Sequence, residues 1–423
     1  MTSSSLELEG RAFAERIFDT VRQLSVDTLG VTRQGYGPKE TAVIDFLRSL
    51  GKELSLEERI DAAGNVWLTL AGKDRSLPAF VAGSHADSVP QGGNFDGLAG
   101  VAAAMLCAWW MRHTNFQPER DFSVLILRCE ESSFFGKAYV GSLGMMGKLT
   151  AADLELKHRT EPVTLGEAIA ACGLDPKQLT MGRPVIDTSK IAAFVELHIE
   201  QGPVLTSSAD VRTGIVTGIR GNIRHKCVKA IGETAHSGAV DKAYRHDALM
   251  AAACLMHTME THWQRFLDAG EDLVFTSGVF KTAPTAAISV IPGLVTFTID
   301  MRSLSMDTCE RFHALLVSEA ERIGAERGVR FEFDAMLRTQ PAALNQMLSE
   351  RIAHAAKLCG IPVAHLASGA GHDSAVLGNA GIPTAMIFIA NQNGSHNPDE
   401  AMELADFMRG TELLWRTVEN YDK

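Results

Sequence analysis

The stretch Ala79–Gly97, AFVAGSHADSVPQGGNFDG, decides the fold, because it joins an apolar strand to a polar, glycine-rich loop. The run Ala79–Gly83 is short and nearly continuously apolar, as strands are when helices cover both faces of their sheet. Leu98–Met111 follows as an Ala-rich apolar segment, typical of a buried helix and too short to cross a bilayer. These residues predict one strand–loop–helix unit of an α/β fold.

The same unit recurs along the chain. Further strands are expected at Phe122–Arg128, Ala192–Leu197 and Pro383–Ala390. Helices are expected within residues 11–50, interrupted near GYGPKE, and at Ser349–Cys359. The pattern predicts an α/β domain with a mixed, largely parallel sheet flanked by helices.

Residues 214–328 follow a different pattern. The expected order of elements is β-α-β-β-α. It consists of the strand RHKCVKAIG, a helix-like segment that contains RHDALMAAACLMH, the strands DLVFTSGVF and LVTFTIDMRS, and the helix Asp307–Arg327. This is the pattern of a small α+β sandwich. A chain of 423 residues exceeds the usual length of one core. We therefore expect one domain from residues 1–213 and 329–423, with residues 214–328 inserted as a second.

Net charge and cysteine usage limit the kinds of binding partner and the cellular compartment that we expect. A net charge of -11, from 40 basic and 51 acidic residues, argues against nucleic acid as a partner. The seven cysteines are scattered and form no C-x-x-C pair, which favours a reducing compartment. The N-terminal MTSSSLELEG is polar and acidic, unlike a secretory signal. We expect a cytoplasmic protein that binds neither membrane nor nucleic acid.

Polar clusters follow the four predicted strands, where the carboxyl ends of strands assemble ligand sites. The clusters are GSHADSVPQGGNFDG with His85, Asp87 and Asp96; CEESSFFG with Glu130 and Glu131; ELHIEQGP with His198 and Gln201; and NQNGSHNPDE with His396. Imidazoles and carboxylates in this combination are the ligands of a site for two divalent metal ions.

Asp96 is the natural bridge between the two ions, because its GGNFDG turn can approach both. His85 and His198 would bind one ion, and Glu131 and His396 the other. Zinc is favoured as the metal, although manganese, cobalt and nickel would accept the same ligands.

Two carboxylates have roles beside the ions. Asp87 would orient the His85 imidazole. Glu130, next to a metal ligand, would act as the general base that takes a proton from water. Each motif alone has a simpler interpretation: Asp96 could be a turn residue and His396 could begin a turn. Their coincidence at four strand ends is the argument for a site.

At these residues the sequence resembles the co-catalytic metallohydrolases of the carboxypeptidase and aminoacylase superfamily. The match is closer to the hydantoinase/carbamoylase branch, which includes N-carbamoyl-L-amino-acid hydrolases, β-ureidopropionases and allantoate amidohydrolases. The resemblance rests on GSHADSVPQGGNFDGLAGV, CEESSFFG, ELHIEQGPVL, SGAGHDS and GSHNPDE, and covers nearly the full length.

The resemblance implies further roles. It implies the same metal ligands and Glu130 as the acid and base, and it makes the inserted domain a dimerisation lid and the protein a homodimer. His236 matches a lid histidine that stabilises the oxyanion, and Arg302 matches an arginine that clamps a substrate carboxylate. Gln201, Gly369 and Ala370 match positions that line the substrate. From the residues alone, Arg302 is a surface arginine at a strand end, and His236 is evenly balanced between the two interpretations.

Two departures from the family pattern fall on substrate recognition. Ser289 in AAISVIP stands where the family usually has asparagine, and HSGAVDK replaces the common HAGTTPM after the lid histidine. The expected function is hydrolysis of a linear C–N bond in a small carboxylate-bearing molecule, an N-carbamoyl-L-amino acid or a ureido acid. The alternatives are an aminoacylase or dipeptidase of the same superfamily, or a non-catalytic relative that binds a ligand in the same cleft.

Overall fold

A computed structural model describes residues 3–423 of the chain, so Met1 and Thr2 of the polar N-terminal stretch lie outside it. The chain divides into two compact units. The first contains the residues up to Thr217 together with Ala343–Lys423, and the second is Gly218–Ala342.

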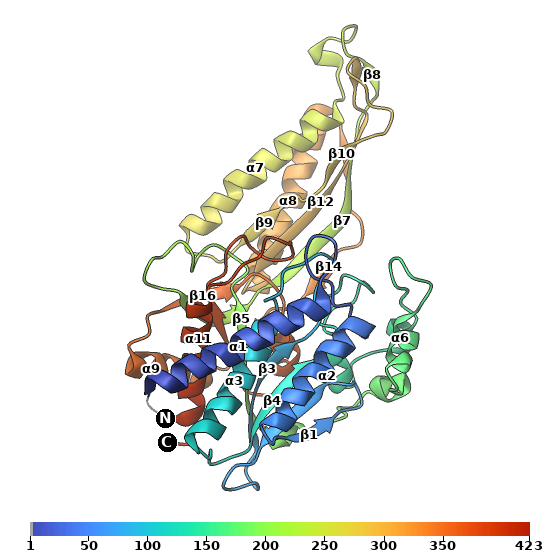
Figure 1. Cartoon of the computed structure of the whole chain (residues 1–423). Coiled ribbons are helices and arrows are strands. Elements are labelled where there is room, and N and C mark those ends of the chain that lie inside the picture. The colour runs from blue at the N-terminus through green and yellow to red at the C-terminus, as the bar shows by residue number, and fades with distance from the viewer. Residues whose placement is uncertain (1–2) are drawn as a thin grey trace. The chain divides into compact units, whose positions relative to one another are not determined.

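The first unit is built on a nine-stranded sheet in the order β1-β2-β4-β3-β5-β17-β6-β15, with β16 paired to β6 (Figure 1). The strands are β1 Glu57–Ile60, β2 Val66–Leu70, β3 Ala79–His85, β4 Phe122–Leu127, β5 Ile191–Ile199, β6 Thr213–Ile219, β15 Ala342–Ala343, β16 Val363–Ser368 and β17 Thr384–Ile389.

The four central strands β4, β3, β5 and β17 are mutually parallel, whereas β1, β2 and β6 pair antiparallel. The prediction of a mixed sheet with parallel strands is thus confirmed, and its parallel part is this central block. Because parallel strands end at the same edge of a sheet, the polar clusters that follow β3, β4, β5 and β17 are brought to that edge.

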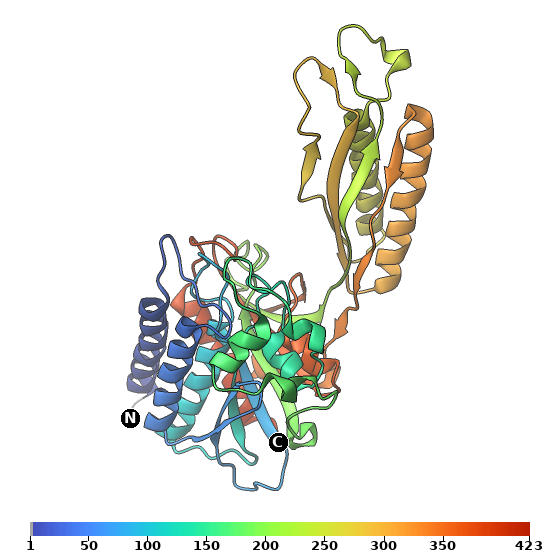
Figure 2. The ribbon, with the colours of Figure 1, turned by 90° about the vertical axis from the view of Figure 1, so that its right-hand side faces the viewer.

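Helices cover both faces of this sheet (Figures 1 and 2). One face packs against α1 Ser3–Ser25, α2 Pro38–Glu53, α3 Leu98–Thr114, α9 Gln346–Cys359 and α11 Leu404–Glu419. The other packs against α4 Val140–Met145, α5 Ala151–Leu154, α6 Leu165–Ala171 and α10 Asp373–Gly378. Neighbouring strand residues alternate between the two cores: Leu68 belongs to the first and Trp67 to the second. This two-sided burial explains why the strands read as continuous apolar runs.

Helix α3 is buried over most of its length. Every residue from Leu98 to Trp109 is buried, and the helix contacts β3, β4 and β5. Its small side chains allow this close approach. It begins at Leu98, two residues after Asp96, so packing of α3 against the sheet positions the start of the helix beside the ends of the central strands.

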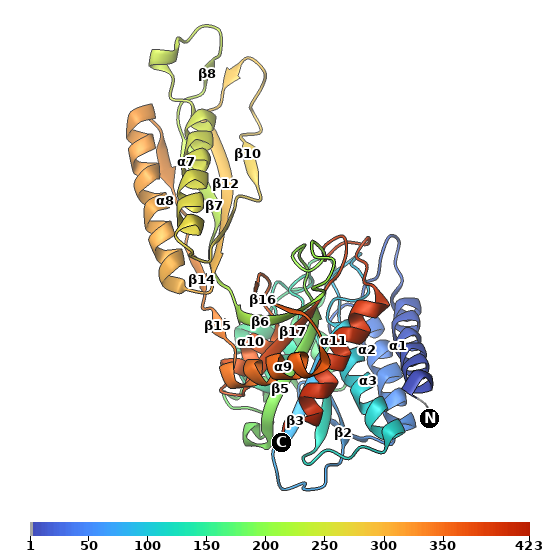
Figure 3. The same ribbon diagram turned by 90° about the vertical axis from the view of Figure 1, so that its left-hand side faces the viewer.

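The second unit is an α+β layer built on a six-stranded sheet in the order β10-β12-β7-β13, with β14 paired to β7 and β9 to β12. A separate pair joins β8 and β11. The strands are β7 Gly221–Ile231, β8 Ala235–His236, β9 Val274–Thr276, β10 Phe280–Thr282, β11 Val290–Ile291, β12 Leu294–Ser303, β13 Arg330–Glu332 and β14 Leu337–Thr339. Helices α7 Ala248–Asp268 and α8 Met306–Arg327 pack side by side on one face of the sheet (Figure 3).

The boundary of this unit differs from the expected 214–328. The unit continues to Ala342 because β13 and β14 return after α8 and pair with β7. Both strands are three residues long, which is too short for a recognisable alternation in the sequence. Among the described residues, the helices are either too short or too polar to cross a membrane.

Candidate metal centre

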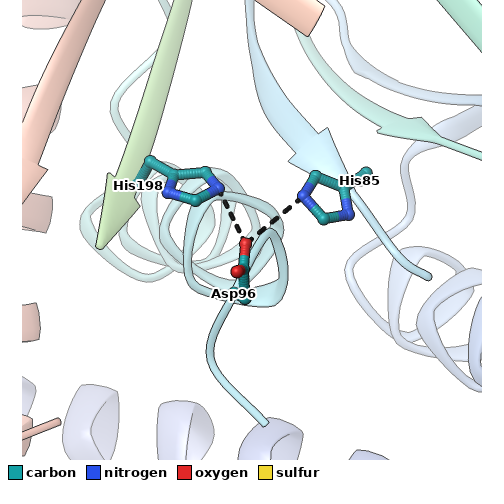
Figure 4. Close-up of side chains that lie close together, drawn as sticks. All are labelled: His85, Asp96 and His198. Atoms are coloured by element: carbon teal, nitrogen blue, oxygen red, sulfur yellow. Dashed lines mark ion pairs between the residues drawn. The ribbon is translucent and has the colours of Figure 1, made fainter. Parts of the chain in front are cut away.

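A first group of side chains joins His85, Asp96 and His198 (Figure 4). His85 is the last residue of β3, and His198 lies near the end of its parallel neighbour β5. Both rings point toward the Asp96 carboxylate, whose Oδ1 lies 3.6 Å from His85 Nε2 and 3.1 Å from His198 Nε2. All three residues are buried.

Gly97 makes this close approach possible. Its φ is +68°, a left-handed conformation that favours glycine. A Cβ at this position would lie 2.4 Å from Cε1 and Nε2 of His85. The glycine after Asp96, which the sequence presented only as part of a turn, therefore leaves room for the imidazole.

A second group joins Asp96, Glu131 and His396. His396 Nε2 lies 3.4 Å from Asp96 Oδ2 and 3.1 Å from Glu131 Oε1. Glu131 is buried in the turn after β4, whereas the His396 side chain, on the loop after β17, is 52% exposed. Asp96 thus presents Oδ1 to the first group and Oδ2 to the second, as a bridging carboxylate does.

Two other side chains hold the Asp96 carboxylate in place. Gln201 Nε2 donates to Oδ2 at 2.8 Å, and Ser395 Oγ donates to the same oxygen at 2.5 Å. Oε1 of Gln201 is buried and finds no hydrogen-bond partner within residues 3–423. Because a buried acceptor is normally paired, this oxygen is available to an N–H group of a ligand.

Asp87 connects His85 of the first group to the backbone of Glu131 in the second. Its Oδ1 lies 3.2 Å from His85 Nδ1 and accepts from the backbone N–H of Glu130 at 2.9 Å, while Oδ2 accepts from the N–H of Glu131 at 3.0 Å. A carboxylate can only accept, so Nδ1 of His85 carries the proton, and Nε2 of the neutral ring keeps its lone pair for the site.

The electrostatics of the two groups favour positive charge. Hydrogen bonds to Asp96 and Glu131 raise the pKa of His396 to about 10. Burial acts to raise the pKa of Asp96, but the neighbouring imidazoles of His198, His396 and His85 lower it well below its usual range. The same field that stabilises a protonated imidazole would stabilise a cation.

Glu130 has the opposite character. Burial raises its pKa well above the usual range of a carboxyl; the charge of His85 opposes this rise, and Glu131 and Asp373 add to it. A carboxyl group with a raised pKa next to two ligand groups is suited to take a proton and to deliver it again.

The donors fit two neighbouring divalent cations. Ligand bonds of about 2.0–2.2 Å to one ion place adjacent donor atoms about 2.8–3.6 Å apart. The separations of 3.1 and 3.6 Å to Asp96 Oδ1, and of 3.4 and 3.1 Å around His396, fall in this interval. Imidazole and carboxylate ligands suit zinc and also manganese, cobalt or nickel.

Of the residues expected to line the substrate, three lie in the same unit as these groups. They are Gln201, described above, and the turn residues Gly369 and Ala370. Ser368 Oγ shapes this turn: it donates to the Ala370 carbonyl at 2.7 Å and lies 2.9 Å from His372 Nε2.

The other three expected residues lie in the second unit. His236, on β8, and Ser289, directly before β11, are both exposed, and Ser237 N donates to the Ser289 carbonyl. His236 Nδ1 accepts from the N–H of Gly238 at 3.1 Å, so its Nε2 carries the proton of the neutral ring. Arg302 is paired with Asp300 at 2.7 Å.

Buried residues that the sequence interpretation did not assign surround the first group. The His372 ring packs edge-on against His198 with centroids 4.5 Å apart. Glu196 accepts hydrogen bonds from Ser84 and Ser374, both at 2.6 Å. Glu196 lies two residues before His198, on the same side of β5, so the two-residue period of a strand could have identified it.

A fully buried arginine braces the loop between His85 and Asp96. Arg33 Nε donates to the Ala86 carbonyl at 2.8 Å, and Nη1 donates to Asn94 Oδ1 at 3.1 Å. The guanidinium therefore connects the two ends of the loop that carries both ligands. Its burial could not be recognised in the sequence, because arginine is usually exposed.

Comparisons with known proteins found similar proteins over nearly the whole chain. A family described as Peptidase family M20/M25/M40 matches residues 81–420. An N-carbamoyl-L-amino-acid amidohydrolase of Paenarthrobacter aurescens is 31% identical, with 98% of this chain and 99% of that protein covered. An allantoate amidohydrolase of Bacillus subtilis is 33% identical, with 92% of each covered. The structure of a hydantoinase/carbamoylase family amidase from Burkholderia ambifaria matches with a TM-score of 0.86 at 27% identity, covering 96% of this chain and 95% of that one.

Proposed function

This chain belongs to peptidase family M20/M25/M40, and from that membership we propose that it hydrolyses a linear C–N bond in an N-carbamoyl-L-amino acid or a related ureido acid. The two relatives named above match this chain over nearly their whole length. Both are amidohydrolases that act on C–N bonds other than peptide bonds. The observation that carries the proposal is the convergence of four imidazole and carboxylate side chains on the Asp96 carboxylate, with Glu130 beside them.

In this proposal His85, Asp96 and His198 hold one divalent ion, and Asp96, Glu131 and His396 hold the other. Such ions, when bound, act as Lewis acids toward a carbonyl oxygen and make water more acidic. Asp87 keeps the Nε2 lone pair of His85 directed at the site and holds the turn that carries the two glutamates. Zinc remains the favoured metal.

Glu130 is the proposed acid and base. Its buried carboxyl would take a proton from the attacking water and return it to the leaving nitrogen. The raised pKa of Glu130 supports both steps, because burial favours the protonated form of this carboxyl and so lets it hold the proton between them.

Substrate recognition is assigned to both units. The unpaired Oε1 of Gln201 would accept an N–H of the ureido group, and Gly369 and Ala370 would line the same cleft. His236, with its proton on Nε2, would donate to the developing oxyanion. Arg302 would bind the substrate carboxylate by exchanging its partner Asp300, and Ser289 would replace the usual amide with a single hydroxyl.

We also propose a cytoplasmic homodimer in which the second unit forms the interface and the lid. The family resemblance supports the dimer. All seven cysteines are free, which supports a reducing compartment.

The test is a substrate screen with purified, metal-loaded protein. N-carbamoyl amino acids, ureido acids and N-acyl amino acids are compared, and ammonia and free amine are measured separately. Release of both from carbamoyl substrates is the expected result. Release of amine without ammonia from N-acyl substrates alone would overturn the proposal in favour of an aminoacylase.

The same assay tests Glu130. Glu130→Gln should lower kcat by about 10²–10⁴-fold at unchanged metal content. Glu119→Gln provides the matched control, because Glu119 is a half-exposed surface residue paired with Lys73. A Glu130→Gln variant with wild-type turnover would exclude Glu130 as the acid and base.

A further inference from the structure

Two arginines share one carboxylate on the sheet of the Gly218–Ala342 unit. Asp300 and Arg302, on β12, and Arg224, on β7, lie on the face of the sheet that α7 and α8 do not cover. Asp300 and Arg224 are direct partners in the pairing of the two strands. Because opposite side chains on neighbouring strands begin about 4.5–5.5 Å apart, the three charged groups meet at one place.

The two arginines hold the carboxylate unequally. Nη2 of Arg302 donates to Asp300 Oδ2 at 2.7 Å, and Nε donates to both carboxylate oxygens at 3.2 Å. Nε of Arg224 also lies 3.2 Å from Oδ2, but this nitrogen is buried and forms no hydrogen bond within residues 3–423. Burial acts to raise the pKa of Asp300, but Arg302 and, to a smaller extent, Arg224 lower it below its usual range. Asp300 is therefore ionised, and Arg224 has a donor that the free protein does not use.

The charges of this group do not balance. Two guanidinium groups face one carboxylate, so a second carboxylate would make the group neutral. A substrate carboxylate bound to Arg302 would displace Asp300, whose side chain is only 28% exposed and would then need another cation. Arg224 can supply it, because its Nε already lies within 3.2 Å of Asp300 Oδ2.

We propose that Arg224 is a further residue that determines recognition of the substrate carboxylate, because it receives Asp300 when Arg302 binds the substrate. The inference rests on the proposed function, in which Arg302 binds that carboxylate. In the free protein Asp300 occupies Arg302 in place of the substrate. On binding, Asp300 moves from Arg302 to the unused N–H of Arg224. The exchange favours substrates that carry a carboxylate over neutral ones.

The kinetic test compares an acid with its neutral amide. We measure kcat/KM for the best substrate of the screen described above, and for the same molecule with a terminal carboxamide. The proteins are wild type, Arg224→Gln and the double variant Arg224→Gln/Asp300→Asn. Arg330→Gln is the matched control, because Arg330 pairs with Glu332 two residues away on the edge strand β13. The products identified in the screen test the proposed function separately.

Arg224→Gln should lower kcat/KM for the acid by about 10-fold, as loss of one charge-assisted hydrogen bond does, and leave the value for the amide within about 2-fold. Asp300→Asn in the same chain should restore the value for the acid, because the group regains the net charge of wild type and no carboxylate competes for Arg302. A wild-type preference for the acid in Arg224→Gln, or a loss that Asp300→Asn does not restore, would show that Arg224 has a structural role only.

A second measurement does not require turnover. Phenylglyoxal modifies guanidinium groups most readily when no carboxylate holds them, and peptide mass spectrometry gives the rate of modification at Arg302. Arg224→Gln should slow this modification several-fold, because Asp300 then pairs with Arg302 alone, and Asp300→Asn should accelerate it. An unchanged rate at Arg302 in Arg224→Gln would overturn the proposal.

Discussion

Replacement of Asp87 by asparagine tests whether metal binding depends on the carboxylate that holds His85 and the backbone of the two glutamates. The carboxylate accepts from His85 Nδ1, Glu130 N and Glu131 N through its two oxygens. Asparagine keeps one acceptor, which can serve His85 and Glu130, but it turns an NH₂ group toward the N–H of Glu131. The variant therefore loses one charge-assisted hydrogen bond and buries two donors against each other, a cost of about 1.5–3 kcal/mol.

That cost should fall mainly on the placement of Glu131. We expect Asp87→Asn to weaken binding of the second ion, or to lower kcat, by roughly 10–100-fold. Metal affinity is measured by competition between chelator-stripped protein and a fluorescent zinc chelator. Unfolding in urea is followed in parallel, to separate an effect on the site from an effect on the fold.

The matched control is Asp121→Asn. Asp121 accepts from Gly72 N at 2.9 Å and pairs with Arg75, and it precedes β4, at the end of the strand opposite to the Glu130 turn. It should change stability without changing zinc affinity. If Asp87→Asn bound both ions as tightly as wild type and kept its kcat, the argument that Asp87 positions the ligands would be refuted.

Three further substitutions test other parts of the site. In chelator-treated protein, His396→Gln should remove a contribution to stability that is present below about pH 6.5 and is lost as pH rises through about 10. The free energy of urea unfolding is measured for wild type and variant at both pH values. An equal difference between the two proteins at both pH values would contradict this prediction. Arg33→Met should lower the unfolding free energy by about 1–3 kcal/mol for each buried acceptor left unpaired, and zinc titration should show weaker binding. Unchanged zinc affinity would mean that the hydrogen bonds of Arg33 are not needed to position the ligands. Gly371→Ala would place a Cβ 1.7 Å from Tyr139 Oη and should cost about 1–3 kcal/mol in thermal unfolding, part of which Tyr139→Phe in the same chain should restore.

The fold class could be predicted because the strands of the first unit are buried on both faces. Ala79–Gly83 was predicted as a strand, and the structure extends it to His85, since the polar end residues continue the parallel pairing with β4. The short strands β13 and β14 were not predicted, because three residues carry no usable period.

The candidate ligands could be identified because they follow strand ends, and parallel strands bring those ends together. Asp87 was also expected beside His85, but the residues that hold the backbone of the loop before α3 could not be identified. Arg33 and Glu400 act through the backbone of the loop before α3: Arg33 binds the carbonyl of Ala86, and Glu400 accepts from the N–H groups of Phe95 and Asp96. Such contacts depend on where two distant segments meet, and no local pattern records this.

The two ends of the inserted unit emerge next to each other. An added Cβ on Gly221, at the start of β7, would lie 2.5 Å from the carbonyl oxygen of Thr339, at the end of β14. The segment between them is thus a module whose excision would leave a gap short enough for a few-residue linker. A protein shortened in this way would show whether the large sheet folds on its own. The module could also be gained or lost in evolution without a change in the strand order of that sheet.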